Sequence, residues 1–145
     1  MGFQIGDRIT SYNINRKYKI FDPKSKSVRN GINFAYNLSF SSKIETGKHC
    51  AILLDKHWNV VDYFVNCYKN DGGIGSIHAE EGLVDRVSDR CDLGECTIIV
   101  VRGNLLGEFS NSAPCDKCLR IMISSGIGRI VFTNRDNKFR EYTMV

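Results

Sequence analysis

The residues of this chain that could carry chemistry fall into two short motifs, His78-Ala79-Glu80 and Pro114-Cys115-Asp116-Lys117-Cys118. Together the motifs offer one imidazole and two thiols as metal ligands, and one carboxylate that is not needed as a ligand. Three protein ligands leave one position of a tetrahedral zinc ion for water. A nearby carboxylate can then move protons to and from that water. These residue types favour a hydrolytic enzyme over a structural zinc finger.

The spacing within each motif predicts that both lie at the start of a helix. Residues two apart do not share a face inside a helix, so His78 and Glu80 converge only if His78 stands at the first turn, outside the regular helical spacing. Cys115 and Cys118, three residues apart, face the same way in a first turn. Because a helix N-terminus lowers the pKa of a thiol, we expect both cysteines to be thiolates.

Two other roles for the CxxC pair remain open from the residues alone. Such a pair can be a redox centre, and a structural zinc site would take a fourth protein ligand, which Cys91 or Cys96 could supply. Otherwise Cys50, Cys67, Cys91 and Cys96 are most simply small buried hydrophobic residues.

The hydrophobic pattern predicts the elements that must position the motifs. Helical spacing predicts helices over 30–42, 78–87 and 115–125. Apolar runs predict strands over 49–54, 60–68, 96–101, 130–132 and 139–144, with the first two forming a hairpin. His49 and His57 are expected at the turn or the surface of that hairpin, and Glu81 on a solvated helix face. The order of elements predicts an α/β fold, a three-layer α-β-α sandwich with a central mixed five-stranded sheet.

The composition fits a single globular domain over residues 1–145, with 42% hydrophobic and 25% charged residues. No apolar run approaches the roughly 18 residues of a membrane span, so no membrane contact is expected. The N-terminus lacks the basic flank and apolar stretch of a secretory signal. With six cysteines and no such signal, we expect an intracellular, cytoplasmic protein rather than a secreted one held by disulfides.

Positive charge is concentrated between Arg16 and Arg29, a stretch that contains six basic residues and only one acidic residue. This stretch is either a solvated basic segment or a patch for phosphate or nucleic acid.

The two motifs, in this order and with strands between and after them, resemble those of the cytidine deaminase-like superfamily, the zinc nucleobase deaminases of the CMP and dCMP type. The signature of that superfamily is H-x-E followed by P-C-x-x-C. The resemblance runs from about residue 48 to the C-terminus and includes the hairpin and the helix-to-strand joint at 126–132. The loop over 103–112 looks longer here than in many members of the superfamily.

The resemblance implies a Zn²⁺ cofactor held by three ligands, His78, Cys115 and Cys118. It implies that Glu80 is the catalytic residue, which carries protons between the metal-bound water and the ring of the base. The backbone N–H of Ala79 would hold the base, and Asn66 would contact the sugar. Phe109 would either stack on a base or pack within its loop.

The function implied is a zinc-dependent hydrolytic deaminase that converts the cytosine-type base of a free nucleoside or nucleotide (cytidine, deoxycytidine or dCMP) to the uracil form and releases ammonia. No helix fits between Phe132 and Phe139, so the last two strands are expected to pair antiparallel, as in the free-cytidine deaminases. The alternative is a deaminase of RNA or single-stranded DNA, with the segment from Arg16 to Arg29 as its nucleic-acid contact. A third hypothesis is a non-catalytic binding module stabilised by zinc, and in such a module Glu80 would have no role.

Two expectations concern the organisation of the chain. Residues 1–28 would form a basic N-terminal extension and residues 29–145 the catalytic core. Because members of the superfamily often complete their pocket with a neighbouring subunit, a homo-oligomer is expected.

Overall fold

The computed structural model describes residues 19–143 except 71, 74, 105–108 and 135–137. Its centre is a mixed β-sheet with the strand order β1-β8-β7-β6-β2-β3. The strands are β1 (Lys19–Ile20), β2 (Lys48–Leu54), β3 (Val60–Val65), β6 (Thr97–Gly103), β7 (Arg129–Thr133) and β8 (Phe139–Thr143). The β6–β7 pair is parallel, and the other pairs are antiparallel. The predicted mixed five-stranded sheet is therefore confirmed, and the short β1 adds a sixth strand beside β8.

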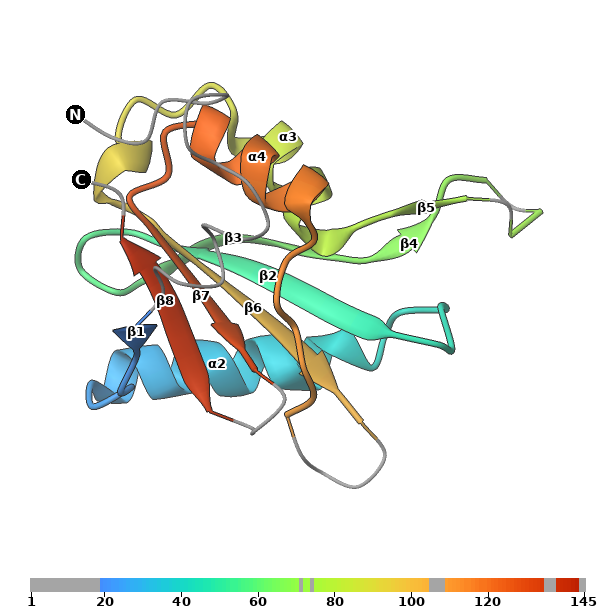
Figure 1. Cartoon of the computed structure of the whole chain (residues 1–145), viewed down its shortest axis with the longest axis horizontal. Coiled ribbons are helices and arrows are strands. Elements are labelled where there is room, and N and C mark those ends of the chain that lie inside the picture. Colours follow the sequence, from blue (N-terminus) through green and yellow to red (C-terminus); the bar gives the residue numbers. More distant parts are fainter. Residues whose placement is uncertain (1–18, 71, 74, 105–108, 135–137, 144–145) are drawn as a thin grey trace.

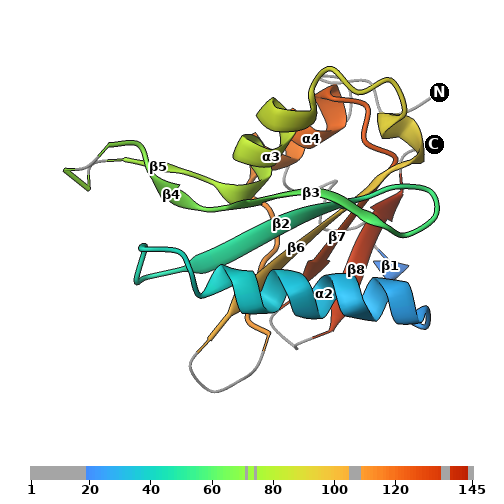
Figure 2. The ribbon, with the colours of Figure 1, turned by 180° about the vertical axis from the view of Figure 1, so that it is seen from behind.

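Helices cover both faces of the sheet, which confirms the predicted three layers. Helix α2 (Lys26–Ser39) lies on one face, and α3 (Ala79–Val87) and α4 (Asp116–Ser124) lie on the other (Figures 1 and 2). Successive residues of a strand point to opposite faces. In β6, Ile98 and Val100 therefore pack with the α3–α4 layer, while Ile99 and Val101 pack with α2. Among the described residues, no helix is long and apolar enough to cross a membrane.

Helix α2 begins earlier in the sequence than predicted, at Lys26 rather than at residue 30. Its buried stripe includes Val28, Ile32, Ala35 and Ser39, a spacing that keeps these residues on one face of a helix. Val28 thus belongs to the buried face, although it lies in a basic stretch. The predicted boundary between extension and core, at residues 28 and 29, consequently falls inside this helix, and residues 1–18 lie outside the described residues.

A second, two-stranded sheet departs from the body of the molecule. Strands β4 (Cys67–Tyr68) and β5 (Ser76–Ile77) pair antiparallel and project beyond the main sheet as a ribbon (Figure 1). The prediction of one continuous strand over 60–68 was wrong, because β3 ends at Val65 and Asn66 turns the chain into the ribbon. The ribbon returns the chain directly to His78.

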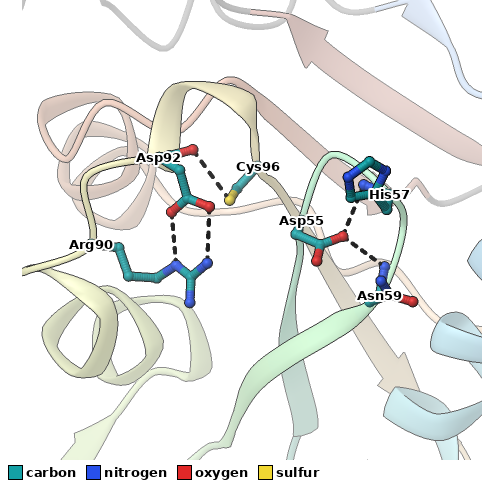
Figure 3. A network of polar contacts seen from close by, with 6 residues as sticks. All are labelled: Asp55, His57, Asn59, Arg90, Asp92 and Cys96. Atoms are coloured by element: carbon teal, nitrogen blue, oxygen red, sulfur yellow. Dashed lines mark hydrogen bonds and ion pairs between the residues drawn. The ribbon is translucent and has the colours of Figure 1, made fainter.

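Polar loops fix the end of the sheet where β2 finishes and β6 begins. Asp55 Oδ1 accepts hydrogen bonds from the backbone N–H groups of His57 at 2.9 Å and Asn59 at 3.0 Å (Figure 3). In the neighbouring loop, the guanidinium of Arg90 donates two hydrogen bonds of 2.9 Å to the carboxylate of Asp92. The two motifs lie near the opposite end of the sheet, where β2 begins and β6 ends.

Candidate metal centre and active site

The structure brings together the three side chains that the sequence analysis assigned as metal ligands. His78 is the N-cap of α3, with extended backbone, and Cys115 is the N-cap of α4, while Cys118 lies in the first turn of α4. His78 Nδ1 lies 3.2 Å from Cys118 Sγ and 3.8 Å from Cys115 Sγ. The three candidate ligand atoms all lie within 4.8 Å of one another. His78 thus stands where the spacing argument required it, just before the first helical residue.

These separations fit a tetrahedral metal ion. Zinc bonds of about 2.0 Å to nitrogen and about 2.3 Å to sulfur place the two atoms about 3.5 Å apart across a tetrahedral angle. The observed values of 3.2 and 3.8 Å lie on either side of that separation. Among the described residues, no further His, Cys, Asp or Glu joins the cluster, and Cys91 and Cys96 are not part of it. The donor set therefore leaves the fourth position of a tetrahedral ion without a protein ligand.

For Cys118, the expected thiolate depends on a bound metal ion. Its thiol is buried, and burial, followed by the nearby Glu80 and Cys115, raises the pKa of Cys118 well above its usual range. The favourable effect of the helix N-terminus is outweighed because the thiol has little contact with water. A metal ion must displace the proton from Cys118 when it binds.

Glu80 lies beside the candidate metal ligands without being one of them. It is the second residue of α3, is only 6% exposed, and lines a cavity together with His78, Ala79 and Cys115. Burial raises the pKa of the Glu80 carboxyl above its ordinary value, and the neighbouring His78 opposes that rise. A raised pKa favours a carboxyl that can hold a proton and return it, as a general acid and base must.

The cavity has a volume of about 320 Å³ and lies between the start of α3, the start of β2, the end of β6 and the loop before α4. Asn66, which was expected to contact the sugar, lines it. Its Oδ1 accepts the backbone N–H of His49 at 2.9 Å, and its Nδ2 donates to the carbonyl of Gly47 at 2.6 Å. Asn66 therefore fixes the start of β2, and these two contacts leave its amide one N–H and one lone pair beyond those used by the described residues.

Phe109 is not among the residues that line this cavity, and of the two roles expected for it the contacts seen here are packing contacts. Its ring packs edge-to-face against Tyr36, with ring centres 4.9 Å apart, and against Phe139 at 5.4 Å. These contacts belong to the hydrophobic cluster on the α2 side of the sheet, opposite α3 and α4. The long loop thus turns its aromatic residue towards the other layer.

Glu81, expected on a solvated face, instead links the two motifs. Its Oε1 accepts a hydrogen bond from the backbone N–H of His78 at 2.8 Å, and its Oε2 lies 3.4 Å from Lys117 Nζ. A Glu at the third helical position that reaches back to the N-cap is half of a capping box. The spacing of His78 and Glu81 carried this signal in the sequence.

Ser112 was not predicted as a site residue, and it anchors the chain just before the second motif. Its hydroxyl donates to the carbonyl of Val100 at 2.7 Å and accepts the backbone N–H of Thr133 at 2.8 Å. It also lines the cavity. The long loop is therefore fixed to β6 and β7 before it delivers Cys115.

The expected surface position of His49 is also corrected, whereas His57 is exposed in its turn as expected. His49 faces the cavity from β2, and Arg102 stands opposite it in β6. Burial is the main reason why the pKa of His49 is lowered, and the charge of Arg102 lowers it further. Cross-strand neighbours of this kind cannot be read from a sequence without the register.

The other four cysteines differ in exposure. Cys50 and Cys96 are buried as predicted, but Cys67 is half-buried and Cys91 is exposed. All six cysteines are free thiols.

A close backbone approach holds α3, with its two site residues, against the sheet. A Cβ atom built on Gly82 would overlap the ring of Phe64 in β3. Glycine at this position therefore lets the helix lie directly on the aromatic ring.

Comparison with known proteins agrees with this arrangement. A crystal structure of cytidine deaminase from Burkholderia pseudomallei matches with a TM-score of 0.56 and covers 79% of this chain and 91% of that chain. At 21% sequence identity, this likeness concerns the fold. A search of curated proteins found no match. The family model of the cytidine and deoxycytidylate deaminase zinc-binding region matches residues 26–134, from the start of α2 to the end of β7. The chain therefore belongs to the family of cytidine and deoxycytidylate deaminases that share this zinc-binding region.

Proposed function

We propose that this protein is a zinc-dependent hydrolytic deaminase that converts the cytosine-type base of a free nucleoside or nucleotide to the uracil form. His78, Cys115 and Cys118 would hold the zinc ion, which supplies an activated water when bound. Glu80 would receive a proton at its carboxylate and deliver protons to the ring and to the departing amine. The Ala79 N–H, in the first turn of α3 where backbone donors have no intrahelical partner, would hold the base.

The observation that carries this proposal is the place of Glu80. The Glu80 carboxyl is 6% exposed, and burial of such a group costs stability. It lines the same cavity as two of the candidate ligands without being one, so a catalytic role would explain its presence. A purely structural metal site needs no such group. The position of Glu80 thus argues against a non-catalytic zinc-stabilised module.

Two features support a small substrate over a polynucleotide. Strands β7 and β8 pair antiparallel, the arrangement expected for free-cytidine deaminases. Helix α2, which carries Lys26 and Arg29 of the Arg16–Arg29 segment, also lies on the sheet face opposite α3 and α4 (Figures 1 and 2). The neighbouring Gly31 of α2 approaches Leu54, at the end of β2, whereas the cavity opens at its beginning. Residues 16–18 of that segment lie outside the described residues.

The test is an ammonia-release panel on the zinc-loaded full chain, with cytidine, deoxycytidine, dCMP, adenosine, guanine and single-stranded oligonucleotides. We expect release from the free cytosine nucleosides or nucleotides. Glu80→Gln should retain zinc and the melting temperature but lose turnover, while Glu95→Gln, an exposed substitution in the short helix η1 (Leu93–Glu95), should match the wild type. Full turnover in Glu80→Gln would overturn the mechanism, and release from oligonucleotides alone would overturn the choice of substrate.

A further inference from the structure

One titratable side chain in the cavity wall has no part in the chemistry at the metal centre. His49 lines the cavity from β2, whereas Glu80 and the candidate metal ligands come from the starts of α3 and α4. Successive residues of a strand point to opposite faces, and Ala51 and Leu53, further along β2, pack with the α3–α4 layer. His49 therefore points to the same side of the sheet as the metal centre, but from a different wall.

The backbone of Gly47 fixes the imidazole of His49. His49 Nδ1 lies 3.3 Å from the carbonyl oxygen of Gly47, which also accepts Asn66 Nδ2 at 2.6 Å. Because a carbonyl oxygen only accepts, this contact places the proton of a neutral ring on Nδ1. A Cβ atom built on Gly47 would lie 3.2 Å from His49 Cε1, so the ring rests against backbone that carries no side chain. The other ring nitrogen, Nε2, is left as a hydrogen-bond acceptor.

The surroundings of the ring keep it neutral and leave Nε2 open. Burial is the main reason why the pKa of His49 is lowered; the contact with Gly47 opposes this, and the charges of Arg102 and His78 lower the pKa further. The imidazole is therefore uncharged at neutral pH. Arg102, opposite His49 in β6, donates to the carbonyl of Thr46 at 3.0 Å. Among the residues that the structure describes, the contact with Gly47 is the one hydrogen bond of the His49 ring.

From this arrangement we infer that His49 Nε2 accepts a hydrogen bond from a sugar hydroxyl of the substrate, so that His49 selects nucleosides that carry this hydroxyl. The inference rests on the proposed deaminase function. A cytosine base donates hydrogen bonds through its exocyclic amine, and this amine must lie at the metal centre in order to leave as ammonia. The remaining donors of a cytosine nucleoside are the hydroxyls of its sugar. A volume of about 320 Å³ is near the lower end for small-molecule sites, so one small ligand meets both walls.

The test compares kcat/KM for cytidine and for its 2′-deoxy, 3′-deoxy and 5′-deoxy analogues, using the zinc-loaded full chain. We expect the wild type to use at least one analogue about tenfold less well than cytidine, because the analogue leaves the acceptor in the cavity without its partner. His49→Leu should lower kcat/KM for cytidine about tenfold and leave the value for that analogue within about twofold of the wild type.

Two further variants separate the hydrogen bond from a merely structural role of His49. The amide oxygen of a glutamine can accept in place of Nε2, so His49→Gln should recover part of the preference for cytidine. His57→Leu makes the same change as His49→Leu in the exposed turn between β2 and β3, and this matched control should behave as the wild type. Equal use of all four nucleosides by the wild type would overturn the inference, as would a loss in His49→Leu that is the same for all four.

Binding of the four nucleosides to the zinc-loaded Glu80→Gln variant, measured by calorimetry, separates this inference from the proposed function. Weaker binding of one analogue than of cytidine, with the difference abolished when His49→Leu is added, supports the hydrogen bond even if no substrate is turned over. Equal binding of all four nucleosides refutes the hydrogen bond even if deamination is observed.

Discussion

Removal of the Glu81 carboxylate should weaken metal binding, although Glu81 is not one of the candidate metal ligands. Glu81 accepts the backbone N–H of His78 at 2.8 Å and lies 3.4 Å from Lys117 Nζ. Lys117 stands between the two candidate cysteine ligands in the sequence. One carboxylate therefore holds together the starts of the two helices that carry the candidate ligands.

The size of the effect follows from these two contacts. A hydrogen bond to a charged group contributes about 1.5–3 kcal/mol, and the lower end applies here because the contact lies near the surface. The Lys117 side chain is 65% exposed, so its ion pair with Glu81 adds about 0–1 kcal/mol. Glu81→Ala should thus lower the free energy of unfolding of the metal-free protein by about 2 kcal/mol. Loss of a partner that orients a metal ligand should also reduce zinc affinity about 10–100-fold.

Zinc affinity can be measured by competition with a chromophoric chelator, and unfolding by urea denaturation of the metal-free protein. Lys117→Met is the matched control because it removes the ion pair and keeps the hydrogen bond to His78. It should change the free energy of unfolding by less than about 1 kcal/mol. If Glu81→Ala bound zinc as tightly as Lys117→Met, the link from Glu81 to His78 would have no role in holding the ligand.

Four further predictions concern the frame around the site. Gly82→Ala should cost about 1–3 kcal/mol of stability, because its Cβ overlaps the Phe64 ring, and an unchanged urea midpoint would contradict that contact. Ser112→Ala leaves the buried N–H of Thr133 without its hydroxyl acceptor and should cost about 1–3 kcal/mol in the same assay. The pKa of Asp55 is lowered in the folded protein, chiefly by the hydrogen bond from the backbone N–H of Asn59. The ionised carboxylate therefore stabilises the fold above pH about 4, the pKa of Asp in an unfolded chain. This stabilisation is lost as the pH falls through the lowered pKa of the folded protein. In Asp55→Asn, the melting temperature should therefore fall less between neutral and acid pH than in the wild type. An unchanged pH dependence of the melting temperature would count against the contact in this turn. Removal of zinc by a chelator should lower the melting temperature, and zinc should restore it; a melting temperature indifferent to zinc would rule out binding to the folded state.

The local features of the fold were predictable because they depend on neighbours in sequence. Spacing alone placed His78 at a helix start, since no other position lets it share a site with Glu80. The continuous apolar run of β6 predicted a strand covered on both faces. The start of α2 was missed because Val28 sits among basic residues, and its burial depends on packing against the sheet.

Other features were hidden because they arise only when distant segments meet. Burial of Cys118 raises its pKa against the effect of the helix N-terminus, and a sequence does not reveal how deeply a thiol lies. The pair formed by His49 and Arg102 depends on the register of β2 against β6. The direction of Phe109 depends on how a long loop crosses the end of the sheet. The chemistry of the motifs was thus readable from the chain, whereas the walls that select a substrate required the fold.

The most direct test of hydrolytic deamination at this site is the source of the oxygen in the product. Zinc-loaded protein would be incubated in ¹⁸O-labelled water with cytidine and, separately, with dCMP, and both the base and the ammonia would be analysed. The exocyclic C–N bond should be replaced by a carbonyl that carries one ¹⁸O atom, with one ammonia released for each base converted. Glu80→Gln should bind the same amount of zinc and yield neither product. The absence of a labelled uracil product from the folded, zinc-loaded wild type with both substrates would contradict this function, as would equal labelling by Glu80→Gln.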